Sequence, residues 1–326
     1  MKKFVRNGFR FYAGYNIPGW PSVSFNRYVN RQLTRMNDSS TPTLHTIIFG
    51  ITKKCGFQCE HCYEWEHLNQ AETLLKDDLV AIVKRFYQAG VSQVQLTGGE
   101  PLNRFKDLLF LLQESPDGID YWLYTTGYSL TYEKAKALKQ NGLTGITISL
   151  DHHLADNHDR FRGVKNAYNK ALIAVTNARK AGLPVCFSLC ATREFISKEN
   201  LLAYAALAKK YGVSFIQVLE PRAVGHYSGK AVQLTAVDHS LLNEFYETIN
   251  YNSAYTDYPI VAYPGYYGRS IGCSGGGVDY LYVDMDGDVH NCPFCQKKLF
   301  SSLGGDLQKK IHQMKLNGCA AFSSSL

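Results

Sequence analysis

Hydrophobic positions follow two alternating patterns along most of the chain. Residues 44–52 (LHTIIFGIT) form a short apolar run, which is typical of a buried strand. Residues 77–90 carry apolar side chains at helical spacing and end in a glycine, which predicts an amphipathic helix. Helical stretches separate the further strand-like runs, which lie at residues 91–98, 121–126, 146–151, 185–192 and 214–220.

This alternation of strands and helices predicts a parallel sheet with right-handed crossovers. The six strand–helix units are fewer than the eight of a closed barrel, so we expect an α/β fold built as a partial (β/α)6 TIM-like barrel. A later hairpin signal, with Asp286-Gly287 at its turn, predicts a small C-terminal cysteine-rich β-hairpin domain. We therefore divide the chain into an N-terminal extension, a barrel domain, a helical linker and a cysteine-rich region, at residues 1–43, 44–225, 226–262 and 263–326.

Polar and reactive residues gather where the predicted strands end. In α/β barrels the chemistry lies at the carboxyl ends of the strands, so these residues should share one face. Glu220 is either a ligand-facing carboxylate or a solvated strand end. Cys186, Ser188 and Cys190 share one strand face and are either small core residues or residues of the barrel lumen. The strand ends concerned are Thr52–Cys55, Thr97–Pro101, Thr125–Gly127, Ser149–Asp151 and Glu220–Arg222.

Three cysteines crowd the loop after the first strand, at Cys55, Cys59 and Cys62. Thiolates this close repel one another unless a metal group binds them, and an iron–sulfur cluster takes up all three as ligands. Three ligands on a four-iron cluster leave one iron open to another molecule. The alternative is a zinc site completed by His61 or His67.

Composition narrows the range of functions. The 326 residues are 45% hydrophobic and 19% charged, which excludes a largely disordered chain. The net charge of +7 comes from scattered basic residues, so a nucleic-acid partner is not expected. Neither a secretory signal nor a membrane-spanning apolar stretch occurs, so we expect a cytoplasmic protein without a membrane partner. In that compartment the nine cysteines indicate metal or redox chemistry.

Two motifs give the chain a specific resemblance. CGFQCEHCYEW, with Tyr63 after the third cysteine, resembles the CxxxCxxC motif of the radical S-adenosylmethionine (radical SAM) enzymes. TGGEPL then resembles the family's Gly-Gly-Glu motif, and the resemblance covers roughly residues 44–225. It implies that the three loop cysteines bind a catalytic 4Fe–4S cluster and that the open iron chelates S-adenosylmethionine (SAM).

The same resemblance assigns SAM contacts at the strand ends. It implies that the segment Gly98–Glu100 receives the amino group of SAM. Glycines allow close approach of the backbone, and a carboxylate accepts hydrogen bonds from an ammonium group. Ser149 and Asp151 lie on one side of a strand, as a pair that grips sugar hydroxyls requires. Thr126 stands where the family has an asparagine. The implied SAM-binding residues are Tyr63, Gly98, Gly99, Glu100, Thr125, Ser149, Asp151 and Arg162, the last of which faces the methionine carboxylate.

The C-terminal region holds a second group of cysteines. Two of them form a Cys-Pro-Phe-Cys sequence after the hairpin, a spacing typical of structural zinc or an iron–sulfur cluster. The region resembles the auxiliary-cluster domains (SPASM or the shorter twitch type) of many radical SAM enzymes, and its few cysteines favour one auxiliary 4Fe–4S cluster. Zinc, or no metal, is the alternative. The four expected ligands are Cys273, Cys292, Cys295 and Cys319.

The chain is therefore expected to be an enzyme. The resemblance implies that reduced flavodoxin or ferredoxin donates an electron, and that SAM is cleaved to methionine and a 5′-deoxyadenosyl radical. This radical would abstract hydrogen from a substrate in the barrel, either a peptide or a small metabolite. The rival interpretations are an iron–sulfur electron-transfer protein, which would need no Gly-Gly-Glu segment, and a zinc-stabilised binding module.

Overall fold

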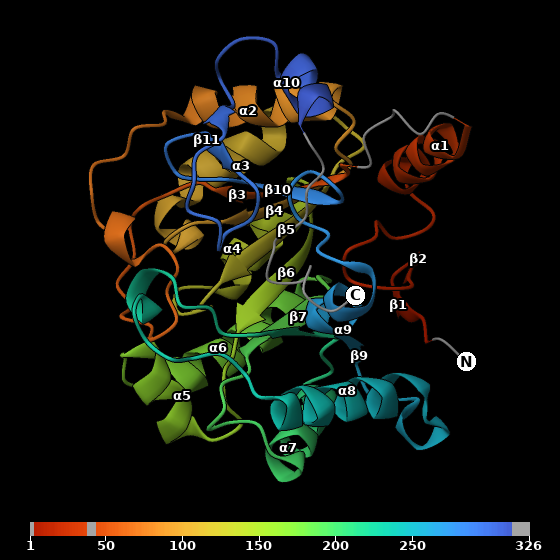
Figure 1. Ribbon diagram of the computed structural model, residues 1–326, viewed down its shortest axis with the longest axis vertical. Helices are drawn as coiled ribbons and strands as arrows, with labels where there is room; N and C mark the ends of the chain where they lie inside the picture. The colour runs from red at the N-terminus through yellow and green to blue at the C-terminus, as the bar shows by residue number, and fades with distance from the viewer. Residues whose placement is uncertain (1–2, 38–43, 315–326) are drawn as a thin grey trace.

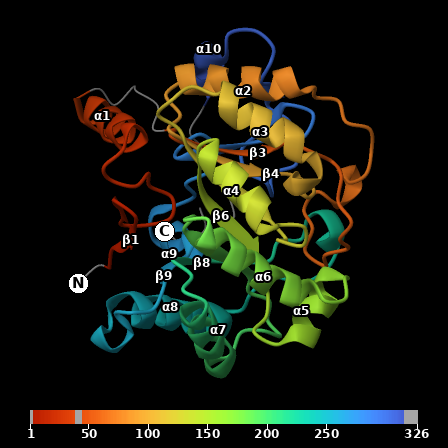
Figure 2. The ribbon, with the colours of Figure 1, turned by 180° about the vertical axis from the view of Figure 1, so that it is seen from behind.

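The computed structural model describes residues 3–37 and 44–314. One curved sheet runs through these residues in the order β12-β11-β10-β3-β4-β5-β6-β7-β8-β9 (Figure 1). Helices cover the outer face of the sheet (Figure 2). Eight of its strands pair in parallel: β3 (Thr46–Gly50), β4 (Gln93–Thr97), β5 (Asp120–Thr125), β6 (Leu143–Ser149), β7 (Val185–Cys190), β8 (Phe215–Leu219), β9 (Ile260–Ala262) and β10 (Tyr280–Val283).

The expected α/β partial barrel is confirmed, and its six predicted strands are β3 to β8. These strands read as continuous apolar runs because helices cover one face and the barrel interior the other; every residue of β4 and β7 is buried. The sheet remains open, since β12 and β9 form its two edges.

The C-terminal hairpin lies in the same sheet, which differs from the expected separate domain. β10 pairs in parallel with β3, and β11 (Asp288–His290) and β12 (Phe300–Ser301) continue the sheet beyond it. The Nζ atom of Lys53, next to the cysteine loop, lies 2.6 Å from Asp286 at the hairpin turn. The local turn signal identified the hairpin but carried no information on which strand it would pair with.

The helices of the described residues follow the strands in regular succession, and none is long and apolar enough to cross a membrane. The α-helices are α1 (Val23–Asn37), α2 (Lys76–Gln88), α3 (Phe105–Glu114), α4 (Tyr132–Gln140), α5 (Ala155–Arg162), α6 (Ala167–Lys180), α7 (Lys198–Lys210), α8 (Ala236–Tyr251), α9 (Pro264–Ile271) and α10 (Leu307–Gln313). Short elements complete the fold: strands β1 (Val5–Asn7) and β2 (Arg10–Tyr12), and 3-10 turns at Trp65–His67, Pro101–Arg104, Gly225–Tyr227 and Ser253–Tyr255.

The N-terminal segment is part of the barrel rather than a loose extension. Tyr15 is buried, and its hydroxyl lies 2.9 Å from the Thr147 hydroxyl of β6. The buried carboxylate of Asp120 at the start of β5 accepts hydrogen bonds from Arg10 at 3.0 Å and Ser24 at 2.6 Å. These contacts fasten the segment across the amino ends of the strands, so the barrel opens at its carboxyl end.

Asp120→Ala should lower the free energy of unfolding by about 1.5–3 kcal/mol, because Arg10 and Ser24 lose a charged acceptor. The measurement is the midpoint of anaerobic urea unfolding followed by circular dichroism. The exposed neighbour Asp117 is the control, and its replacement by Ala should change stability by about 0.5 kcal/mol at most. Equal effects of the two substitutions would contradict the anchoring role.

Candidate functional site

The three loop cysteines open onto one large cavity at the carboxyl ends of the strands. Cys59 is buried, and Cys55 and Cys62 are half-buried. All three line a cavity of about 720 Å³ that extends down into the barrel lumen. The cavity wall also includes Ser149 and Arg162. The sequence thus correctly grouped these side chains on one face.

The Gly-Gly segment packs against the backbone of the cysteine loop. The Gly99 N–H donates to the Thr52 carbonyl at 2.7 Å, and the Glu100 N–H donates to the Lys54 carbonyl at 2.8 Å. A Cβ on Gly98, whose φ is +128°, would lie 2.5 Å from the Thr52 oxygen. A Cβ on Gly99 would lie 2.5 Å from the Lys54 oxygen. Both glycines are therefore required for the two strand ends to meet, whether or not a ligand approaches them.

Glu100 makes contacts other than the expected one with an ammonium group. Its Oε1 accepts from the Thr125 hydroxyl at 2.6 Å and the Leu102 N–H at 3.1 Å. Its Oε2 accepts from the N–H and hydroxyl of Thr126, at 2.8 and 2.7 Å. Four hydrogen bonds occupy both oxygens of this buried carboxylate, and the expected contact with a SAM amino group stays a prediction. Thr126, the residue that replaces the family's asparagine, supplies two of the four.

Asp151 likewise holds a neighbouring residue instead of reaching the large cavity. Its Oδ2 accepts from the Nε and Nη2 atoms of Arg162, each at 2.6 Å, and its Oδ1 accepts from the Cys190 N–H at 2.9 Å. The strand β6 ends at Ser149, and only Ser149 of the expected pair faces the cavity. The expected grip of both residues on a ribose stays a prediction.

Arg162 brings a fixed positive charge to the cysteine loop. Its Nη1 lies 3.5 Å from the Cys59 sulfur, while Asp151 holds the other side of the guanidinium. Burial works against this charge, but Asp151 and Cys59 outweigh it and raise the pKa of Arg162. The arginine thus stays charged in a buried site and can face an anionic group of a ligand.

The protonation of the loop thiols favours a bound metal group. Burial raises the pKa of Cys55 to about 11 and that of Cys62 to about 12. Burial also raises the pKa of Cys59, against the opposing effect of Arg162. Thiolates in this pocket are stable only when positive metal centres replace their protons, so metal binding must release protons.

A single zinc ion fits the loop poorly. Zinc requires its ligand atoms within about 2.0–2.3 Å of one centre, and no three His, Cys, Asp or Glu side chains in the described ranges converge in this way. The ring of His67 pairs with Glu64 at 3.0 Å. His61 stacks on Phe161, and its buried Nδ1 has no hydrogen-bond partner among the described residues. An iron–sulfur cluster spreads its ligands over several irons and does not require three thiols to meet at one ion.

The C-terminal cysteines face the same cavity. The sulfurs of Cys292 and Cys295 lie 3.3 Å apart, and Cys273 lines the cavity with them. The contact with Cys295, together with burial, raises the pKa of Cys292. The pair is close enough to share a metal ligand shell, while Cys319 lies outside the described residues. Among the described residues no third His, Cys, Asp or Glu side chain converges with this pair, so a metal at this place remains a prediction.

An aromatic contact links the two cysteine groups. The Tyr63 ring lies 5.9 Å from the Tyr282 ring of β10 and 6.1 Å from that of Phe294, which stands between the paired C-terminal cysteines. Tyr282 donates its hydroxyl to the buried carboxylate of Glu64. Tyr63 thus lines the cavity as expected, and Glu64, which the sequence did not single out, binds the hairpin to the cysteine loop.

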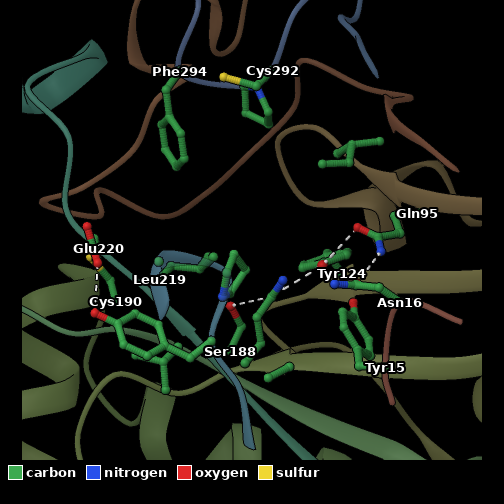
Figure 3. Close-up of a pocket in the computed structure, with 18 of the residues that line it drawn as sticks. Tyr15, Asn16, Gln95, Tyr124, Ser188, Cys190, Leu219, Glu220, Cys292 and Phe294 are labelled. Carbon is green, nitrogen blue, oxygen red and sulfur yellow. Dashed lines mark hydrogen bonds between the residues drawn. The ribbon is translucent and has the colours of Figure 1, made fainter. Parts of the chain in front are cut away.

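Other contacts around the cavity were not readable from the sequence. His226 covers the cysteine loop: its backbone N–H donates to the Cys62 carbonyl at 2.9 Å, and its ring stacks on Trp65. Glu220 faces the cavity, but its carboxylate pairs with Arg269 of α9. Cys186 is a core residue, whereas Ser188 and Cys190 line the lumen. Figure 3 shows Cys190 beside Glu220 on one side of the cavity and Gln95 with Tyr124 on the other, with Cys292 and Phe294 at a further part of the wall.

An α/β barrel that brings three cysteines and a buried arginine to the carboxyl ends of its strands has the arrangement of an enzyme that binds a metal group beside an anionic ligand. Residues 49–208 match the sequence model of the Radical SAM superfamily. The chain belongs to this superfamily, whose members use SAM and a 4Fe–4S cluster. It is an enzyme by the same membership.

Several characterised proteins are similar to the chain. It is 31% identical to a GTP 3′,8-cyclase of Aliarcobacter butzleri over 52% of this chain and 54% of that one. It is 26% identical to an AdoMet-dependent heme synthase of Nitratidesulfovibrio vulgaris over 49% of this chain. The chain thus spans about half the length of these relatives, 54% and 44% respectively. A GTP 3′,8-cyclase of Xanthomonas axonopodis pv. citri is 25% identical over 85% of this chain and 86% of its own.

Solved structures share the fold. SuiB of Streptococcus suis superposes with a TM-score of 0.67 at 17% identity, over 88% of this chain and 69% of that one. A structure of anSMEcpe with bound AdoMet superposes with a TM-score of 0.65 at 18% identity, over 84% of this chain and 81% of that one. Identities this low support the architecture alone.

Arg162→Ala should weaken SAM binding about tenfold to hundredfold, because a charge-assisted contact is lost. The measurement is an anaerobic SAM titration of the cluster-loaded protein, with iron content determined in parallel. Arg160→Ala, an exposed arginine on the same helix, is the control and should leave the affinity unchanged. Equal affinities of the two variants would show that Arg162 does not face the cofactor.

Proposed function

We propose that Cys55, Cys59 and Cys62 hold the 4Fe–4S cluster and that the barrel lumen below them holds the substrate. The single observation that carries this proposal is the common cavity, which joins the three thiols, Ser149 and the Asp151-bound Arg162 to the lumen. When bound, the cluster supplies the electron that cleaves SAM to methionine and a 5′-deoxyadenosyl radical, and that radical abstracts hydrogen from the substrate.

The residues of this chain bind and orient the reactants. Three cysteines leave one iron of a four-iron cluster free for the amino and carboxylate groups of SAM. Arg162 faces the carboxylate, and Ser149 and the backbone of Gly98–Gly99 line the place of the rest of the cofactor. Glu100 acts as a positioning residue, because it holds the ends of β4 and β5 together. The lumen below shields a radical from water, since the N-terminal segment closes its far end.

We further propose that Cys273, Cys292 and Cys295 bind an auxiliary 4Fe–4S cluster, with Cys319 as the candidate fourth ligand. Their position on the cavity wall supports a role near the substrate, in holding it or in accepting an electron from the product radical. A reduced flavodoxin or ferredoxin is the proposed electron donor.

The substrate is proposed to be a peptide or a small metabolite without a polyphosphate. A nucleoside triphosphate needs an excess of positive charge around it, as a GTP cyclase would require. The described wall of the cavity balances its formal charges instead, with Lys3, Arg162 and Arg222 against Glu64, Glu220 and Asp279. Among the proteins that share the fold, SuiB has been solved with its precursor peptide SuiA.

Replacing Cys55, Cys59 and Cys62 together by Ala should abolish 5′-deoxyadenosine formation, because the open-iron site is lost. The assay is anaerobic incubation with SAM and dithionite, followed by chromatography. Cys186→Ala removes a buried thiol outside the cavity and should retain activity, which makes it the matched control. Undiminished 5′-deoxyadenosine in the triple variant would refute the assignment.

A Cys292→Ala/Cys295→Ala variant should lose about half of the cluster iron, since one of two similar clusters is removed. It should still form 5′-deoxyadenosine, because the loop site is untouched. Iron, sulfide and zinc analysis of both proteins provides the measurement. A wild type that holds one cluster and one zinc ion, with only zinc lost in the variant, would rule out the auxiliary cluster.

A further inference from the structure

A set of uncharged polar side chains lines the barrel lumen below the cysteine loop. Gln95 of β4, Tyr124 of β5, Ser188 of β7 and Gln217 of β8 all line the cavity. Figure 3 labels the first three. Gln95 and Gln217 are only 4% and 7% exposed. The interior of a parallel barrel is ordinarily apolar, and a buried amide is costly unless its hydrogen bonds are made.

The hydrogen bonds within this set leave one amide incomplete. The Tyr124 hydroxyl lies 3.0 Å from Gln95 Oε1 and 3.2 Å from Gln217 Oε1, yet it carries one hydrogen and can donate to only one of them. Ser188 lies 3.3 Å from the same Gln217 oxygen. The Gln217 nitrogen donates to no group in the described part of the chain. If the side-chain amide of Gln217 is turned by about 180°, its oxygen instead of its nitrogen becomes the atom without a partner in the described part of the chain.

Gln95, in contrast, is held at both ends of its amide. Its nitrogen lies 3.4 Å from Asn16 Oδ1, which the N-terminal segment places in the lumen, and its oxygen accepts from Tyr124. The network is therefore anchored at Gln95 and Tyr124, while Gln217 presents a hydrogen-bonding atom to the cavity. Because this atom faces the open cavity, a polar group of a ligand in the lumen can take the place of water there.

The strand register places Gln217 next to the proposed cofactor site. Ser149 pairs with Ser188 across β6 and β7, and Ser188 pairs with Gln217 across β7 and β8. Paired residues of parallel strands project to the same side, and adjacent strands lie about 4.8 Å apart, so Gln217 is roughly 10 Å from Ser149. A substrate group bound at Gln217 would thus lie beside SAM at Ser149.

We propose that Gln217, held by Tyr124 and Ser188, is a specificity-determining residue that binds an uncharged amide group of a peptide substrate. The inference rests on the proposed function. An amide offers a donor and an acceptor side by side, which matches a glutamine whose neighbours carry no charge. The lactam edge of a nucleobase has the same chemistry, but the balanced charges of the cavity wall favour the peptide bond as its source.

The test uses the cluster-loaded protein with SAM under anaerobic conditions. One arm adds a random N-acetylated hexapeptide library, and the other adds GTP; retained ligand is measured by size exclusion and mass spectrometry. Gln217→Met keeps the side-chain length and removes both hydrogen-bonding atoms, and Gln217→Glu keeps acceptors but cannot donate. Gln140→Met, at an exposed helical glutamine, is the control.

The wild type and the control should retain a subset of peptides. Gln217→Met should retain about tenfold less, with SAM affinity and iron content unchanged. Three outcomes would overturn the proposal. Gln217→Met could retain as much peptide as the wild type, the wild type could retain no peptide, or the variant could lose SAM binding. If the wild type retained GTP and no peptide, and Gln217→Met no longer retained GTP, the amide group would come from a nucleobase and not from a peptide bond. A wild type that forms no 5′-deoxyadenosine would refute the proposed function itself, which separates the two failures.

Discussion

The buried carboxylate of Glu100 is the contact on which the cavity depends. It receives two hydrogen bonds from Thr126, one from Thr125 and one from the start of the following turn, and so holds the end of β5 against the end of β4. The backbone of the same segment bonds to the cysteine loop after β3. Three strand ends are thereby fixed relative to one another. A buried charge of this kind persists only when all its acceptor positions are filled, which makes the arrangement rigid.

The sequence predicted the barrel strands well because burial on both faces leaves a strong local record, as in the wholly buried β4 and β7. It missed β9, since a run of three residues carries little periodic signal. It also left the N-terminal segment outside the barrel. Tyr15 meets Thr147, and Ser24 meets Asp120, across long stretches of chain, and no local pattern records such contacts.

The residues of the candidate site likewise fall into those that local sequence patterns predict and those that they do not. The cysteine spacing and Ser149 follow from local motifs, because short loops and strand ends determine where such side chains point. The partners of Glu100 and Asp151 do not follow from local motifs, because residues of another element donate hydrogen bonds to each carboxylate. Sequence reasoning assigned both to the cofactor, whereas the structure assigns their hydrogen bonds to Thr126 and Arg162. A carboxylate that is fully used by the protein contributes by holding its partner in place.

Charged side chains are not spread evenly over the wall of the cavity. Two ion pairs lie near the cysteines and along the rim, Arg162 with Asp151 and Glu220 with Arg269, while Lys3 and Asp279 line the cavity at the amino ends of the strands. Between these groups, the hydrogen-bond partners of Gln95, Tyr124 and Gln217 among the described residues are all uncharged. A charged cofactor and an uncharged substrate group would therefore prefer different parts of the same cavity. Ser149 and Gln217 lie in the same register across β6 to β8, so these two parts of the cavity adjoin. The reacting atoms of the cofactor and the substrate would therefore come together between them.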